Sequence, residues 1–221
     1  MTSGPSTATN GAPRAPLSRS AVLDAALRLV DEHGIDALSM RRLGKELGVE
    51  AMSLYNHVPN KAALLDGLVE QVINEIDRPP ADAPWDDQVR EMARSYRRLA
   101  HAHPNVVPLI AMRPFNTITA LDPVEQAFGI FRAAGFDDHA ALHAFRTLAG
   151  FATGYTLAET GSFFGETNPA EATGSLGGED LDPERFPNLT HMLPTIANCD
   201  HDAEYEFGID VIIEGLRTKL P

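Results

Sequence analysis

The chain has 221 residues, of which 43% are hydrophobic and 22% charged, a composition that excludes overall disorder and allows a small domain joined to a larger one. Its longest apolar runs are far shorter than the ~20 residues needed to cross a bilayer, and the first residues lack a signal-peptide pattern, so we expect a cytoplasmic protein without membrane contact. The single cysteine, Cys199, excludes an internal disulfide. The net charge of −13 is uneven, with +1 on residues 1–61 and −14 on residues 62–221.

The first elements show clear local signals. Residues 1–17 are rich in Pro, Gly, Ser, Thr and Ala, which predicts a disordered arm. From Ser18, apolar residues recur at helical spacing until Gly34, so a first helix is expected there. Ser39 is a good N-cap for a second, short helix that ends at Gly48.

A tight turn after Gly48 leads into AMSLYNHV, a short helical segment in which Leu54 alone clearly belongs in a core. Asn60 can cap a fourth helix, whose apolar stripe runs to Ile76. The proline-rich residues 78–84 then break the helix. Residues 18–78, called the head below, are therefore predicted to form a helix-turn-helix domain.

Residues 85–221, called the body below, are predicted to be helical and show no alternating strand pattern of useful length. Its helices are expected near residues 86–102, 104–112, 121–134, 138–161 and 201–219. A glycine-rich stretch, 161–182, is expected to be a mobile loop, and PERFPNLTHML after it to add one short helix. The predicted fold class is all-α, with a three-helix head and a larger helical body.

The segment LGVEAMSLYNHVPNKAALLDGL, with the pattern around it over residues 18–75, resembles the DNA-binding head of the TetR family of transcriptional repressors. The resemblance implies a homodimer that holds double-stranded operator DNA and responds to a small molecule. The family places its operator contacts at the start of the second helix and along the third. The matching positions are Ser39, Met40, Arg41, Ala51, Met52, Ser53, Tyr55, Asn56, His57 and Lys61.

Each matching side chain has a contact available with DNA. Arg41 can make bidentate hydrogen bonds to guanine, and Asn56 can pair with adenine or reach a phosphate. Met52 and Ala51 can pack on thymine methyl groups, and since neither forms a hydrogen bond, some sequence readout is expected through apolar contact or DNA shape. The side chains better placed for phosphate oxygens are Ser53, Tyr55, His57 and Lys61. Taken singly, each residue has an ordinary structural explanation; clustering on one short helix favours recognition.

Two C-terminal helices carry more apolar surface than one core contact would use. Residues 139–159 combine large apolar side chains with small ones such as Gly150 and Gly154, and residues 207–216 add apolar side chains on several faces. We expect an intermolecular four-helix bundle, as the resemblance implies, with two recognition helices ~34 to 36 Å apart on a palindromic site. The alternative is that both helices pack only within one monomer.

The body also resembles the effector domain of the family, chiefly through HPNVVPLIAMRP, FRAAGFDDHAALHAF and GFATGYTLAE. In the tetracycline repressors, a histidine and a threonine before an Arg-Pro pair hold the magnesium carried by the drug. Those positions are Leu109 and Met112 here, which are poor ligands for a hard cation, while Glu159 keeps the acid of the family. We therefore expect an apolar or aromatic effector, with no cofactor and no metal. The predicted pocket residues are Met92, Tyr96, Leu109, Met112, Phe115, Gln126, Phe131, Phe145, Phe151 and Tyr155.

Other classes of function have less support in the sequence. The chain has no Gly-x-Ser-x-Gly elbow, phosphate loop or dinucleotide fingerprint, so an enzyme is not expected. His139 and His143 have the spacing of helical zinc ligands, but Ala140 stands where a catalytic glutamate would be. One alternative is a metal-sensing regulator, and another is a dimeric protein-interaction module. A metal-sensing site could be assembled from His101, His103, Cys199 and His201.

Overall fold

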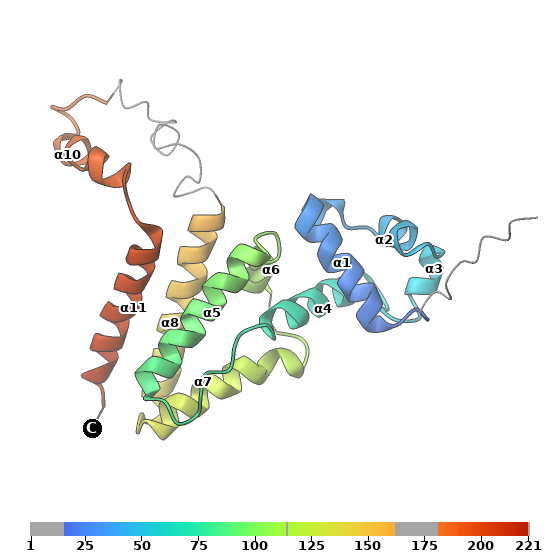
Figure 1. The fold of residues 1–221 in the computed structure, drawn as a ribbon, viewed down its shortest axis with the longest axis horizontal. Helices are drawn as coiled ribbons and strands as arrows, with labels where there is room; N and C mark the ends of the chain where they lie inside the picture. Colours follow the sequence, from blue (N-terminus) through green and yellow to red (C-terminus); the bar gives the residue numbers. More distant parts are fainter. Residues whose placement is uncertain (1–15, 114, 162–180, 221) are drawn as a thin grey trace, which may run out of the picture.

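The computed structural model describes residues 16–113, 115–161 and 181–220, and within them the chain is helical and has no strand. Figure 1 shows a small group of helices, α1 to α3, at one end and a longer bundle at the other, with α4 running between them. The all-α fold predicted from the sequence is confirmed. Most of the expected arm (residues 1–17) and of the expected loop (residues 161–182) lies outside the described residues.

The head consists of four α-helices and one short 3₁₀ helix. They are α1 (Arg19–His33), η1 (Ile35–Ala37), α2 (Met40–Leu47), α3 (Ala51–Leu54) and α4 (Lys61–Ile73). The Ser39 hydroxyl accepts a hydrogen bond from the backbone N–H of Arg42, and the Asn60 side chain accepts one from Ala63, at 3.2 and 2.8 Å. Both N-caps are as the sequence predicts. The fourth helix, however, ends at Ile73 rather than reaching Ile76.

The tight turn expected between α2 and α3 is present, and it brings two backbone segments close together. Gly48 adopts the left-handed conformation, with φ of 63°. Gly44 is buried, and a Cβ atom added there would lie 2.9 Å from the carbonyl oxygen of Val49, so only glycine fits without a backbone shift. After Leu54 the α-helix gives way to a turn, because the N–H groups of His57 and Val58 both point to the Leu54 carbonyl, at 2.9 Å each.

The body consists of six α-helices and one short 3₁₀ helix within the described residues. They are α5 (Trp85–Ala102), α6 (Val107–Met112), η2 (Thr119–Leu121), α7 (Asp122–Ala133), α8 (Asp138–Thr160), α10 (Pro187–Ile196) and α11 (His201–Arg217). Helix α10 begins in the PERFPNLTHML segment, where one short helix was expected. Helix α8 packs against α5, α6, α7 and α11, so it forms the centre of the body (Figure 1).

One apolar core continues from the head into the body. It includes Leu54 and Leu68 of the head, Val72 near the end of α4, and Tyr96 and Ile209 of the body, all buried. A second, smaller cluster forms around Phe131 and lies between α5, α7 and α8. Helix α4 thus contributes buried side chains to both the head and the body. None of the helices in the described ranges has the length and apolarity required of a membrane span.

Candidate functional site

The third helix separates one buried anchor from an outward surface. Leu54 is completely buried, whereas Met52 is 75% exposed and Tyr55 41% exposed. Asn56 is also exposed, while Ala51, Ser53 and His57 are half-buried. Helix α3 packs on α2, and it lies in the part of the head that is farthest from the body (Figure 1).

The remaining predicted DNA contacts lie on the segments that flank α3. Ser39 and Arg41 are exposed at the start of α2, Met40 is half-buried, and Lys61 is exposed at the first position of α4. The N-terminus of a helix carries a partial positive charge, which favours phosphate at the position of Lys61. The outward side of the head therefore offers donors, a cation at each flank and apolar methyl and thioether groups, which is the chemistry needed to contact a DNA groove.

The body contains a partly open apolar cavity of about 390 Å³. Its wall is built from α4, α5, α6, α7 and α8 and from Phe115 in the loop after α6. Five predicted pocket residues lie on this wall: Met92, Tyr96, Phe115, Phe131 and Phe145. The volume suits a drug-sized ligand.

Two hydroxyl groups are the polar features of the cavity wall among the described side chains. The Thr153 hydroxyl donates a hydrogen bond to the Tyr96 oxygen at 3.2 Å. Burial raises the pKa of Tyr96, so its phenol stays neutral. A ligand in this cavity would therefore meet a mostly apolar surface with one pair of neutral hydrogen-bonding groups.

The other five predicted pocket residues lie away from the cavity wall. Leu109 is half-buried, Met112 is 85% exposed and Gln126 is half-buried beside the wall residue Ala127. Phe151 and Tyr155 face α11 instead, where Phe151 stacks on Tyr205 with ring centroids 5.4 Å apart. On α8, residues 145, 149 and 152 share the helix face toward the cavity, and residues 151 and 155 share a neighbouring face.

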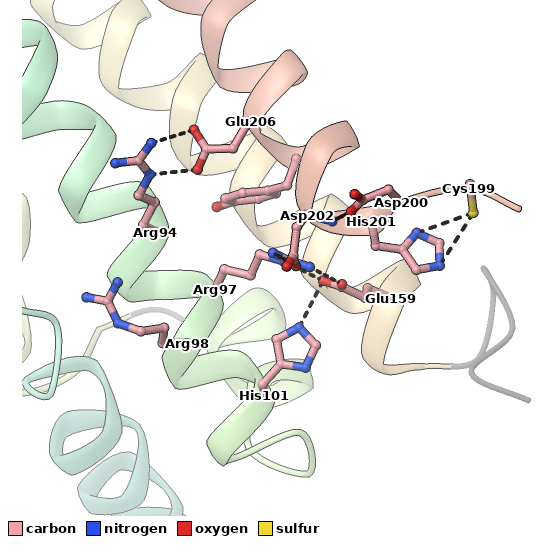
Figure 2. A pocket seen from close by; sticks show the side chains of 11 residues that line it. Arg94, Arg97, Arg98, His101, Glu159, Cys199, Asp200, His201, Asp202 and Glu206 are labelled. Carbon is pink, nitrogen blue, oxygen red and sulfur yellow. Dashed lines mark hydrogen bonds and ion pairs between the residues drawn. The ribbon is translucent and has the colours of Figure 1, made fainter.

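A second, polar pocket of about 1060 Å³ lies between α5, the end of α8 and the start of α11 (Figure 2). Figure 2 shows Arg97 directed at Glu159, with two hydrogen bonds of 3.0 and 2.5 Å. His101 approaches the same carboxylate at 3.1 Å. Burial acts to raise the pKa of Glu159, but hydrogen bonding and charge from Arg97, with His101, outweigh it and lower that pKa. The sequence pointed to Glu159 and His101 separately but not to their contact with Arg97, because the three residues are far apart in the chain.

Polar contacts also tie the head to the part of the body around α6. Arg113, just after α6, donates to Asp66 of α4 at 2.6 Å. His103 lies between Asp31 of α1, at 2.9 Å, and Glu75 just after α4, at 3.1 Å. In addition, Ile73 and Ile76, at the end of α4 and just beyond it, form part of the cavity wall. A change in the shape of the cavity thus has a short physical route to the head.

Comparisons with known proteins match both parts of the chain. Residues 22–68 match bacterial regulatory proteins of the tetR family, and residues 78–220 match the tetracyclin repressor-like C-terminal domain. The chain is 30% identical to the class D tetracycline repressor protein of Escherichia coli, over 93% of this chain and 92% of that protein. It is 28% identical to the HTH-type transcriptional repressor DrrR1 of Streptomyces coeruleorubidus, over 94% and 80%.

A similar fold is found in the crystal structure of the TetR family protein ActR from Streptomyces coelicolor in complex with actinorhodin. The TM-score is 0.79 and the identity 33%, with 92% of this chain and 98% of that chain covered. The likeness therefore extends over both the head and the body.

Proposed function

Because this chain belongs to the tetR family of bacterial regulatory proteins, we propose that it is a ligand-responsive, DNA-binding transcriptional repressor. The observation that carries the proposal is the course of α4, which starts shortly after α3, at the exposed Lys61, and ends in the wall of an apolar cavity. DNA binding is assigned to residues 18–78, and effector binding and dimerisation to residues 85–221. The family matches to residues 22–68 and 78–220 support this division.

The operator contacts are assigned to the exposed side of α2, α3 and the start of α4. Tyr55 and Asn56 are exposed beside the fully buried Leu54, so the backbone of α3 can approach DNA while its anchor stays in the core. The body carries the excess negative charge of the chain, which disfavours DNA contact there and leaves it to the head.

The proposed assembly is a homodimer formed through α8 and α11. Helix α11 uses one face inside the monomer, where Tyr205 and Ile209 are completely buried. Its other face leaves Phe207 70% exposed and Val211 56% exposed. A second copy would cover these side chains, and a two-fold axis would set the spacing of the two heads on a palindromic operator.

The proposed effector is an apolar or aromatic molecule with few polar groups. The mostly apolar cavity wall and the single Tyr96–Thr153 hydroxyl pair support this class of ligand. A magnesium–tetracycline complex does not fit, because Leu109 and Met112 offer no oxygen or nitrogen ligand and Met112 is 85% exposed. The ActR complex with actinorhodin supports a ligand-binding body in this fold.

Release of DNA follows from linkage between the two sites. A ligand that binds one shape of the cavity more tightly shifts the population toward that shape. Since Ile73 lies in the cavity wall and Asp66, two turns earlier on α4, is bound to Arg113, that shift would move α4 and with it the head. In a dimer, a changed head spacing lowers operator affinity.

The test uses the full-length protein. Binding sites are selected from a random DNA pool, and apolar compounds are screened for those that raise the melting temperature. We expect palindromic sites and a compound that weakens operator binding about 5- to 150-fold. The cavity-filling substitution Ala149→Phe should remove the effect of the compound, whereas Ala133→Phe, at an exposed position of α7 outside the wall, should keep it. A protein that selects no DNA, or that keeps full operator affinity with the compound bound, contradicts the proposal.

A further inference from the structure

Three side chains with different ligand atoms meet where the chain enters α11. Cys199, His201 and Glu204 place one sulfur, one ring nitrogen and one carboxylate oxygen within 4.8 Å of one another. The Cys199 Sγ atom lies 3.8 Å from His201 Nδ1 and 3.7 Å from Nε2, and Figure 2 shows the two side chains facing each other. His201 Nδ1 lies 3.2 Å from Glu204 Oε2.

Two of the three separations are close to the edges of a tetrahedral zinc site, and the third, between Cys199 Sγ and a Glu204 carboxylate oxygen, is at most 4.8 Å. With bonds of about 2.3 Å to sulfur and about 2.1 Å to nitrogen and oxygen, tetrahedral angles place sulfur and nitrogen about 3.6 Å apart and nitrogen and oxygen about 3.4 Å apart. The observed 3.8 and 3.2 Å differ from those values by only a few tenths of an ångström. We propose that Cys199, His201 and Glu204 bind one thiophilic divalent cation, for which Zn²⁺ is the best fit.

The ligand set determines which cations can compete. Magnesium and calcium prefer sites made entirely of oxygen atoms, so a thiol and an imidazole disfavour both. Zinc and its neighbours in the first transition row accept sulfur, nitrogen and oxygen together. Three protein ligands leave a fourth tetrahedral position for water or for a group supplied from outside.

A residue of another helix orients two of the three ligands. The Tyr155 hydroxyl, from α8, lies 3.1 Å from the backbone carbonyl oxygen of His201 and 3.2 Å from Glu204 Oε2, so its single proton can be donated to either acceptor. Hydrogen bonds of this kind hold metal ligands in place, and their loss typically weakens metal affinity about 10- to 100-fold. A bound cation would in this way connect the start of α11 to α8.

The site is separate from the proposed effector cavity and does not depend on the proposed function. Cys199 and His201 line the polar pocket of Figure 2, which shares no lining residue with the apolar cavity. The surrounding charge is mixed, but Arg97, which lines the same polar pocket, is already paired with Glu159 and Asp202. The acidic balance of the body favours a cation over an anion.

The test uses metal-free, full-length protein titrated with Co²⁺ as a spectroscopic substitute for Zn²⁺. Because Cys199 is the only cysteine, a thiolate-to-cobalt charge-transfer band can arise only from that residue. We expect one cobalt ion per chain, a band that Zn²⁺ abolishes by displacement, and no band in Cys199→Ser. Tyr155→Phe should weaken zinc affinity about 10- to 100-fold, and His201→Gln and Glu204→Gln should weaken it further.

The matched control is His139→Gln, which alters the exposed His139–His143 pair at the start of α8 and should leave zinc affinity unchanged. Circular dichroism of each variant reports whether the fold is kept; if Cys199→Ser unfolds, Glu204→Gln carries the comparison. Saturating Co²⁺ without a charge-transfer band overturns the proposal, as does equal zinc affinity in the wild-type protein and folded Glu204→Gln.

Discussion

The head and the body present their candidate sites in opposite ways. In the head, the side chains proposed to contact DNA lie between residues 39 and 61, and the exposed ones on α3 flank a buried Leu54. In the body, the cavity wall comes from five helices and a loop between residues 73 and 153, and its side chains point inward. The outward surface of the head is thus suited to a large partner such as DNA, and the cavity of the body to a small molecule. Helix α4 belongs to both sites, which makes it the physical link between them.

The cationic side chains of the two regions also differ, since those on α5 are paired with carboxylates and those of the head are exposed. On α5 in the body, Arg94 and Arg97 are paired with carboxylates at 3.0 Å or less, in contacts to α8 and α11. Arg41 and Lys61 in the head are exposed. Because Arg94 and Arg97 are held by carboxylates, they are not available to bind phosphate. Arg41 and Lys61 are exposed, so the cations that can reach DNA lie in the head although the chain as a whole is acidic.

The largest effect is expected from Leu54→Ala, because Leu54 is the completely buried anchor of α3. Removing its side chain should lower the free energy of unfolding by about 2–5 kcal/mol and displace the recognition surface. Urea denaturation measures the first effect and operator binding the second. Leu189→Ala, at an exposed position of α10, should change stability by less than about 0.5 kcal/mol. Unchanged operator affinity in Leu54→Ala would show that α3 is not the recognition element.

The second largest effect is expected on DNA affinity, with no change in the free energy of unfolding. Arg41→Ala should weaken operator binding by about 1–3 kcal/mol, or about 5- to 150-fold, because a charged hydrogen-bonding contact is lost. Fluorescence anisotropy with labelled operator measures the change. Arg132→Ala, an exposed arginine of α7 in the body, is the control and should bind normally. Equal losses in the two variants would mean that the head has no special role.

A smaller effect is expected on the communication between the sites. The Arg113–Asp66 contact joins the end of α6 to α4, so Arg113→Ala should lower the free energy of coupling between ligand and operator by about 1 kcal/mol. Ligand affinity in the absence of DNA should change less. Operator titrations with and without ligand measure the coupling. A coupling free energy equal to that of the wild-type protein would exclude this contact from the link.

The smallest effect concerns acid stability. The folded-state pKa of Glu159 lies below its ordinary value of 4.5, because Arg97 and His101 outweigh the opposing effect of burial. The carboxylate therefore stabilises the fold above the unfolded-state pKa, and this stabilisation is lost as the pH falls through the lower folded-state pKa. Between about pH 5 and pH 3, the melting temperature of wild type should fall more steeply than that of Glu159→Gln.

The control for this pH series is Asp36→Asn, since Asp36 is exposed and lies in the short η1 helix. Its melting curve should follow that of the wild-type protein over the whole range. If the curves of Glu159→Gln and the wild-type protein were parallel, the ion cluster of Figure 2 would have no part in acid unfolding.

The head was predictable from the sequence because its signals are local. Ser39 and Asn60 act as caps, and Gly48 takes the left-handed conformation that ends α2. Gly44 was missed, since its need for a small side chain comes from the close approach of Val49 and Ala51, which no periodic pattern reports.

The body was predictable as a set of helices but only partly as a site. Apolar spacing shows that Phe145 and Phe151 are both on buried faces of one helix, yet not that Phe145 faces α7 while Phe151 faces Tyr205 of α11. The pairing of Arg97 with Glu159 could not be predicted for the same reason: it depends on how α5 and α8 are arranged relative to each other. Contacts between distant segments decide these cases, and a single sequence does not encode them in any local pattern.

The central claim is that occupancy of the cavity and binding of DNA are linked through α4. Calorimetry of the ligand with free protein, and again with operator-bound protein, tests this most directly, because linkage between two sites is reciprocal. The account predicts that operator DNA weakens ligand affinity by the same factor by which the ligand weakens operator affinity. Equal ligand affinity in the two titrations would contradict it.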